Sequence, residues 1–222
     1  MTDRGNITHI YFVPGLAAST SIFEYLKLPE AHFETHLLKW FVPSPNMSLA
    51  EYAAEMNRHV LHENVVLVGV SFGGILVQEM AKLKAVKKVV IISSVKSSEE
   101  LPNKMRFASF THAHKLLPTS LVSNVELIAK YAFGETVTKR LELYEKYLDV
   151  RDETYLNWAI DKMVNWRQEM PLKNLVHIHG DKDPVFPFER IKNCIPVKNG
   201  THTMIIHRAK WFNEHLATII LQ

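Results

Sequence analysis

The segment LVGVSFGGILVQEM, residues 67–80, places a serine between glycines where an apolar run gives way to a helical pattern. Residues 65–68, before Ser71, are apolar and mostly β-branched, which is typical of a strand buried on both faces. After Ser71 the apolar residues recur at helical spacing, at Ile75, Leu76, Met80 and Leu83. We therefore expect Ser71 at a tight turn between a strand and a helix, with its side chain exposed at the tip.

Other apolar segments of strand length alternate with helical patterns along the chain. The strand candidates are residues 7–13, 33–40, 64–70, 87–93, 175–179 and 194–197. Strands that alternate with helices are typical of a mostly parallel central sheet covered by helices. The sequence therefore predicts an α/β fold.

Residues 96–170 interrupt this alternation, because they contain several amphipathic stretches but no convincing strand. The interval is longer than a single crossover between strands needs. We expect it to be a helical insertion, with residues 1–95 and 171–222 forming the core of the fold. Helical spacing alone does not distinguish such an insertion from helices that pack directly on the sheet.

The composition indicates a folded chain that acts on small molecules. With 222 residues, 47% of them hydrophobic, the chain can bury a sizeable core. The net charge of +3 comes from scattered residues, so neither nucleic acid nor an anionic membrane is an expected partner. Cys194 is the only cysteine, and no apolar run approaches the roughly 20 residues that span a bilayer. We expect a cytoplasmic location.

A serine nucleophile needs a base within hydrogen-bond reach and a group that orients this base. Two polar segments follow predicted strands near the end of the chain, HGDKDPVFP at residues 179–187 and NGTHTMII at residues 199–206. They supply Asp183 and His202. In a parallel sheet the carboxyl ends of the strands share one edge, so both segments are expected beside Ser71.

The motifs VGVSFGG, HGDKDPVFP and GTH, in this order, resemble those of the α/β-hydrolase-fold serine hydrolases. The resemblance covers nearly the whole chain. It implies that Ser71 is the nucleophile, Asp183 the acid and His202 the general base. It also implies that the helical insertion is a cap over the serine, and that no cofactor is needed.

The oxyanion loop of the family corresponds to VPGL, residues 13–16, after the first predicted strand. The implied donors are the backbone N–H groups of Leu16 and Phe72, since Pro14 has no N–H group. This loop departs from the family's HGGG-type subgroup, because it contains a single glycine, Gly15. Few residues precede the first strand, so the resemblance implies a shortened sheet of about six strands.

Several site residues have alternatives in the sequence. Asp181 is an alternative to Asp183 as the acid, and His207 is an alternative to His202. Two HxH pairs, His177 with His179 and His112 with His114, raise the possibility of a metal. Neither pair has a third ligand at suitable spacing, so we expect no metal site.

The resemblance implies a carboxylesterase-like serine hydrolase that cleaves an ester or similar acyl bond of a small, apolar substrate. Aromatic residues of the insertion either line the substrate pocket or form the core of the insertion itself. These are Phe107, Phe110, Tyr131, Phe133, Tyr144, Tyr147, Tyr155, Trp158 and Trp166. The same fold also supports carbon–carbon bond hydrolysis, hydroxynitrile cleavage, haloperoxidase-like activity and ligand binding without catalysis. The sequence gives no indication of the oligomeric state.

Overall fold

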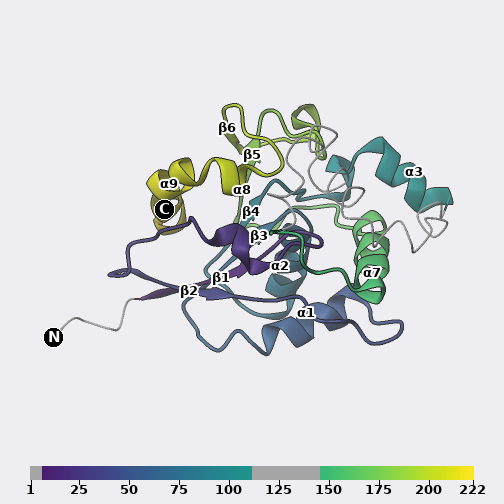
Figure 1. Cartoon of the computed structure of the whole chain (residues 1–222), viewed down its shortest axis with the longest axis horizontal. Coiled ribbons are helices and arrows are strands. Elements are labelled where there is room, and N and C mark those ends of the chain that lie inside the picture. The colour runs from purple at the N-terminus through teal and green to yellow at the C-terminus, as the bar shows by residue number, and fades with distance from the viewer. Residues whose placement is uncertain (1–6, 112–145) are drawn as a thin grey trace.

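Six parallel strands form the centre of the molecule in the computed structural model, which describes residues 7–111 and 146–222 (Figure 1). The strands are β1 (Thr8–Val13), β2 (Phe33–Leu37), β3 (Val65–Val70), β4 (Lys88–Ile92), β5 (Leu175–Gly180) and β6 (Ile195–Val197). The α-helices are α1 (Leu49–Asn57), α2 (Phe72–Leu83), α3 (Asn103–Thr111), α7 (Glu153–Val164), α8 (Met204–His207) and α9 (Ala209–Leu221). Short 3-10 helices are η2 (Thr20–Phe23), η3 (Ser98–Glu100) and η6 (Phe188–Arg190).

The strand order is β2-β1-β3-β4-β5-β6, and every neighbouring pair is parallel. The second strand, β2, lies on one side of β1. The chain then crosses to the other side of β1, where β3, β4, β5 and β6 follow in sequence order. Open α/β sheets bind their ligands at such a switch point, outside the carboxyl ends of the strands. Here the switch point lies between β1 and β3, where Val13 pairs with Gly69.

The predicted α/β fold with a parallel sheet of about six strands is confirmed. The second strand is shorter than expected, because β2 ends at Leu37. Leu38 still donates to the carbonyl oxygen of Phe12, at 2.9 Å. Two residues later the indole of Trp40 donates to the carbonyl oxygen of Gly15, at 3.0 Å, and the chain has left the sheet.

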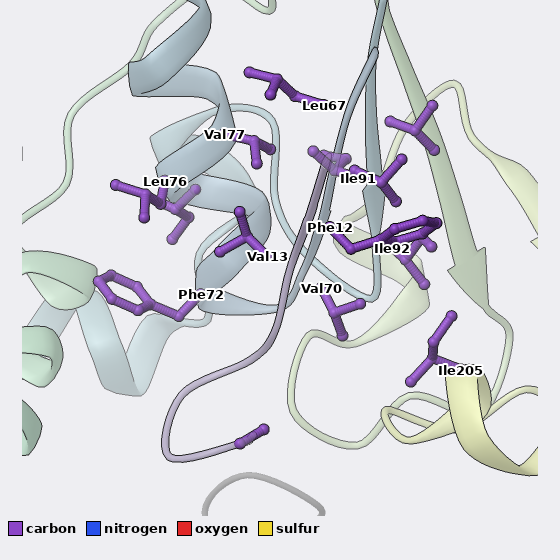
Figure 2. Close-up of a cluster of buried hydrophobic side chains, with 14 of the residues drawn as sticks. Phe12, Val13, Leu67, Val70, Phe72, Leu76, Val77, Ile91, Ile92 and Ile205 are labelled. Atoms are coloured by element: carbon purple, nitrogen blue, oxygen red, sulfur yellow. The ribbon is translucent and has the colours of Figure 1, made fainter. Parts of the chain in front are cut away.

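Apolar side chains cover both faces of the central strands. In Figure 2, Val13 lies on the same side of the sheet as Val77 of α2, whereas Phe12 lies on the other side with Ile92 and Ile205. All five side chains are buried. Burial of one such side chain stabilises the fold by about 1.5–3 kcal/mol, so the strands that carry the site are held firmly.

The predicted insertion spans residues 96–170. Its described part contains η3, α3 and α7. Residues 112–145 lie outside the described residues, and with them Tyr131, Phe133 and Tyr144 of the predicted aromatic set. On α7, Tyr155 packs against Trp40 at 5.3 Å between ring centroids, and Trp158 packs against Tyr52 at 4.3 Å. These two aromatic residues therefore belong to the protein interior. The division into a core and a cap remains a prediction.

Among residues 7–111 and 146–222, no helix combines the length and the apolar character that crossing a membrane requires.

Candidate active site

Ser71 occupies a strained turn between β3 and α2. Its φ of 53° and ψ of −119° place it in a conformation that side-chain-bearing residues rarely adopt. The flanking glycines allow the turn to close. A Cβ atom at Gly69 would lie 2.5 Å from the carbonyl carbon of Gly73, and one at Gly73 would lie 2.5 Å from the carbonyl oxygen of Val13. The turn is therefore closed by backbone packed directly on backbone.

Neighbouring strands hold the backbone of Ser71 in place. Its N–H group donates to the carbonyl oxygen of Ile92, at 2.9 Å. Its carbonyl oxygen accepts from the hydroxyl of Ser94, at 2.7 Å, and from the N–H of Gly74, at 2.9 Å. These bonds keep the side chain of Ser71 beyond the carboxyl end of β3.

The structure brings Ser71, His202 and Asp183 into one chain of hydrogen bonds. The hydroxyl oxygen of Ser71 lies 2.9 Å from Nε2 of His202. On the other side of the ring, Nδ1 of His202 lies 2.9 Å from Oδ2 and 3.1 Å from Oδ1 of Asp183. All three side chains are buried. An Nδ1–H group that donates to Asp183 leaves the Nε2 lone pair of His202 directed at the hydroxyl of Ser71.

Asp183 is held in its ionised form. Burial favours the neutral carboxyl and raises its pKa, but the charge of His202 and hydrogen bonds outweigh this effect and lower the pKa of Asp183 below its ordinary value. The N–H groups of Val185 and Phe186 donate to Oδ1 of Asp183 at 2.8 and 3.0 Å. The tight turn after β5 therefore supplies a carboxylate that orients His202.

The alternative site residues lie elsewhere. Asp181 is two residues before Asp183, and its backbone pairs with Val197 of β6. His207 is an exposed residue at the end of α8, whereas His202 is buried against Ser71. The geometry thus brings together Asp183 and His202, and neither alternative.

His177 and His179 form a buried pair behind Asp183. Nε2 of His177 lies 3.0 Å from Nδ1 of His179, and Nε2 of His179 lies 2.9 Å from the carbonyl oxygen of Phe186. The latter contact requires that Nε2 of His179 carries the proton and donates it. The pair therefore braces the loop that carries Asp183.

We expect the His177 pair to make the stability of the protein sensitive to acid. Burial first, and then the positive charges of His179 and Lys96, hold the pKa of His177 well below its ordinary value of 6.5. As the pH falls below 6.5, His177 becomes protonated in the unfolded chain but stays neutral in the folded chain, so the free energy of unfolding decreases. In His177→Gln we expect this decrease to be smaller than in the wild type, by up to about 1.4 kcal/mol per pH unit.

Urea unfolding at pH 7, 6 and 5 measures this effect. His177→Gln keeps hydrogen-bonding groups beside His179, and His215→Gln, at an exposed site, is the matched control. An unchanged pH dependence of the free energy of unfolding in His177→Gln would show that another group causes the acid sensitivity.

The loop after β1 lies directly against Ser71. A Cβ atom at Gly15 would contact the Cβ of Ser71 at 3.5 Å. The carbonyl oxygen of Gly15 accepts from Trp40 and from Ala18, and Ala17 has a positive φ of 60°. The loop is therefore fixed from both sides.

Two N–H groups are candidates for binding an oxyanion. Phe72 is the first residue of α2, so its N–H group lies at the positive end of the helix dipole and has no partner within the helix. In the described ranges, neither this group nor the N–H of Leu16 donates to a backbone carbonyl. Both follow strands that end at the switch point.

A small apolar cavity of about 30 Å³ adjoins Ser71 and His202. Its other described lining residues are Gly15, Leu16, Ala18, Ile22, Val70, Thr203, Ile205 and Ile206. Of the aromatic residues that the sequence suggested for the pocket, those within residues 96–111 and 146–170 do not line it. Branched aliphatic side chains of η2, β3 and α8 form part of its wall.

Comparison with known protein families identifies the family of the chain. The model of the alpha/beta hydrolase family matches residues 10–215, which include most of β1, all of the other strands, the serine turn and both late loops. The chain belongs to the alpha/beta hydrolase family. No curated protein sequence gives a significant match.

Solved structures with the same fold have low sequence identity to this alpha/beta hydrolase. A hydrolase from Pseudomonas aeruginosa PA01 has a TM-score of 0.70 and 14% identity, with 98% of this chain and 91% of that chain covered. A bromoperoxidase from Bacillus anthracis has a TM-score of 0.68 and 19% identity, covering 98% and 92%. An esterase from Exiguobacterium antarcticum has a TM-score of 0.66 and 16% identity, covering 98% and 93%. At these identities the likeness shows the fold alone.

Sequence reasoning missed two supports of the site in this alpha/beta hydrolase. Trp40 holds the loop after β1 through Gly15, and its ring lies 5.4 Å from that of Phe72. Ser94 holds the turn from the next strand. Neither residue lies in a motif, and only their positions just after β2 and β4 could have indicated a role near the carboxyl edge.

Proposed function

We propose that this alpha/beta hydrolase is a serine hydrolase that cleaves an ester, or a similar acyl bond, of a small apolar substrate. The observation that carries the proposal is the unbroken hydrogen-bonded chain from Ser71 through His202 to Asp183, with 2.9 Å at each link. A hydroxyl group held on a strained turn, and bonded to an imidazole that a carboxylate orients, has the requirements of an activated nucleophile.

In the proposed reaction, the hydroxyl oxygen of Ser71 attacks the carbonyl carbon while Nε2 of His202 accepts the hydroxyl proton. Asp183 stabilises the imidazolium that forms. The carbonyl oxygen becomes an oxyanion and accepts hydrogen bonds from the N–H groups of Leu16 and Phe72. The bond to the alcohol then breaks, and the alcohol leaves with the proton from His202. A water molecule, activated by the same imidazole, releases the acid and restores Ser71.

The aliphatic cavity supports a short acyl group as the preferred substrate. Ile22 on η2 is buried and lines this cavity. We expect Ile22→Ala to raise the ratio of kcat/KM for p-nitrophenyl hexanoate over acetate about 10-fold or more, because a hydrophobic pocket discriminates by about 1–3 kcal/mol per methylene.

The control for this prediction is Ile191→Ala, since Ile191 is also buried but does not line the cavity. This variant is expected to keep the wild-type ratio. An unchanged ratio in Ile22→Ala, with both variants folded, would place the acyl group somewhere else.

The experiment that tests the function is covalent labelling with a fluorophosphonate, followed by intact mass and peptide mapping. We expect one adduct, on Ser71, and hydrolysis of short p-nitrophenyl esters by the unlabelled protein. Labelling of a different residue, or no labelling, would contradict the proposal. Labelling of Ser71 without turnover of any ester would favour a binding protein that keeps the three side chains.

The other reactions that this fold supports need separate assays. Peroxide-dependent bromination of an organic reporter, carbon–carbon bond cleavage of a diketone and release of cyanide from a hydroxynitrile each have a distinct product. Ester turnover that exceeds each of these by orders of magnitude in kcat/KM is the expected result. A larger value for any of them would replace the proposed reaction.

A further inference from the structure

Three histidines meet at the β1–β2 edge of the sheet, in a place that the proposed hydrolase reaction does not use. They are His9 on β1, His36 on β2 and His62 in the segment before β3. One ring nitrogen from each lies within 4.8 Å of the others. His9 is near the amino end of β1, whereas Ser71 lies beyond the carboxyl end of β3. The cluster is therefore separate from the candidate active site.

Strand pairing explains how these residues come together. In the parallel register, His9 lies opposite Glu34, and Tyr11 lies opposite His36. Side chains two residues apart on a strand point to the same face, so these four side chains share one face of the sheet. His62 reaches the same place from the loop, and its ring stacks on that of His9 at 3.5 Å between centroids.

The nitrogen atoms of His9 and His36 are spaced nearly as two ligands of one metal ion are. Nδ1 of His9 lies 3.1 Å from Nε2 of His36. Two donors at about 2.0–2.1 Å from a tetrahedral Zn²⁺ ion are about 3.4 Å apart, so only a small adjustment separates the observed pair from this geometry. The rings of His36 and His62 have their centroids 4.8 Å apart, which places the third imidazole beside the first two.

Glu34 supplies an oxygen donor next to the imidazoles. One carboxylate oxygen of Glu34 lies 3.6 Å from Nδ1 of His9, and the other lies 3.7 Å from Nε2 of His36. Its side chain is 56% exposed, so it has freedom to move toward an ion. Three imidazoles and one carboxylate make a complete tetrahedral set of N and O donors.

Tyr11 acts as an outer partner of the cluster. Its hydroxyl oxygen lies 2.7 Å from Nδ1 of His62 and also accepts from the N–H group of Leu61, at 3.1 Å. Histidines that bind metals usually have their second nitrogen held by such a hydrogen bond, which fixes the ring orientation. The bond to Tyr11 thus leaves Nε2 of His62 as the nitrogen that is available to an ion.

The cluster is accessible from solvent. A groove of about 690 Å³ has His36, His62 and Tyr11 in its wall, so an ion can enter from solvent.

We propose that His9, His36 and His62, together with Glu34, bind one divalent transition-metal ion, with Zn²⁺ as the best match. Imidazole with carboxylate suits zinc better than magnesium or calcium, which prefer oxygen donors alone. The ion connects β1, β2 and the segment before β3. Its role is to stabilise the edge of the sheet, and it takes no part in the proposed hydrolysis.

The test is titration of tag-free protein with Zn²⁺ in competition with a chromophoric chelator. We expect one ion per chain, a rise of Tm with Zn²⁺, and tetrahedral d–d bands when Co²⁺ is used instead. His36→Ala and His62→Ala are each expected to weaken Zn²⁺ binding at least about 100-fold, since loss of an outer partner alone costs up to about that much.

Three further variants make the test specific. His32→Ala removes an exposed histidine next to β2 and is expected to bind Zn²⁺ like the wild type. Glu34→Gln alters only an exposed side chain, and weaker binding in this variant tests the site even if a histidine variant fails to fold. Ser71→Ala is expected to keep full affinity, so failure of the hydrolase proposal and failure of the metal proposal are distinguishable.

Two results would overturn the proposal. One is the absence of Zn²⁺ binding, which would leave the cluster as histidines that bond and stack on one another. The other is binding that His36→Ala and His62→Ala leave unchanged but that a His112→Ala/His114→Ala variant abolishes.

Discussion

Ser71→Ala is expected to lower kcat for a short p-nitrophenyl ester at least about 10⁴-fold, with little change in the free energy of unfolding. The large loss follows because Ser71, His202 and Asp183 form one hydrogen-bonded unit, and loss of the nucleophile removes the covalent route. What activity remains would come from substrate binding and the oxyanion donors. Steady-state kinetics with active-site titration of the wild type gives this ratio.

The matched control is Ser44→Ala, because Ser44 is exposed and lies outside the site. This variant is expected to retain wild-type kinetics. If Ser71→Ala hydrolyses the ester at the wild-type rate, the proposed function is wrong, even though the fold is that of the family.

Gly69→Ala is expected to destabilise the protein by about 3 kcal/mol or more, the upper part of the range for overpacking a close-packed interior. The added methyl group would lie 2.5 Å from the carbonyl carbon of Gly73 and 2.6 Å from the backbone nitrogen of Gly74. Both are backbone atoms of the turn and the first turn of α2, so no flexible side chain can move aside. For a chain of this length the loss corresponds to a fall in Tm of at least about 6 °C.

Gly15→Ala provides the comparison, because a Cβ atom there would make only an ordinary contact, 3.5 Å from the Cβ of Ser71. Thermal and urea unfolding of the two variants should therefore differ by several degrees in Tm. Equal stability of Gly69→Ala and Gly15→Ala would mean that the turn can relax, and that close backbone packing does not hold Ser71 in place.

The fold was largely predictable from local sequence patterns. Apolar runs such as residues 65–68 have no polar face, and this pattern directly predicts a strand covered on both sides. The end of β2 was not predictable in this way. Residues 38–40 remain mixed in character, and the strand stops because Trp40 turns toward Gly15, a contact with a residue far away in the chain.

The proposed catalytic residues could be named from the sequence because each lies in a short segment just after a strand. A parallel sheet then brings these segments to one edge, so chain separation does not matter. The histidine cluster had no such signal. His9 and His36 belong to different strands and His62 to a loop, and only the register of β1 against β2 brings them together. The histidine patterns visible in the sequence were the two HxH pairs, and in one of these His177 and His179 bond to each other.

The left-handed backbone of Ser71 has a consequence for how this protein can change over time. A φ of 53° suits glycine, or asparagine, better than serine, and holding serine there costs about 1 kcal/mol or more. Replacement of this serine by glycine would thus favour folding, and under the proposed function only the need for a hydroxyl group would oppose it. A lineage that no longer required the proposed reaction would be expected to lose this serine early while keeping Gly69 and Gly73, on which the turn depends.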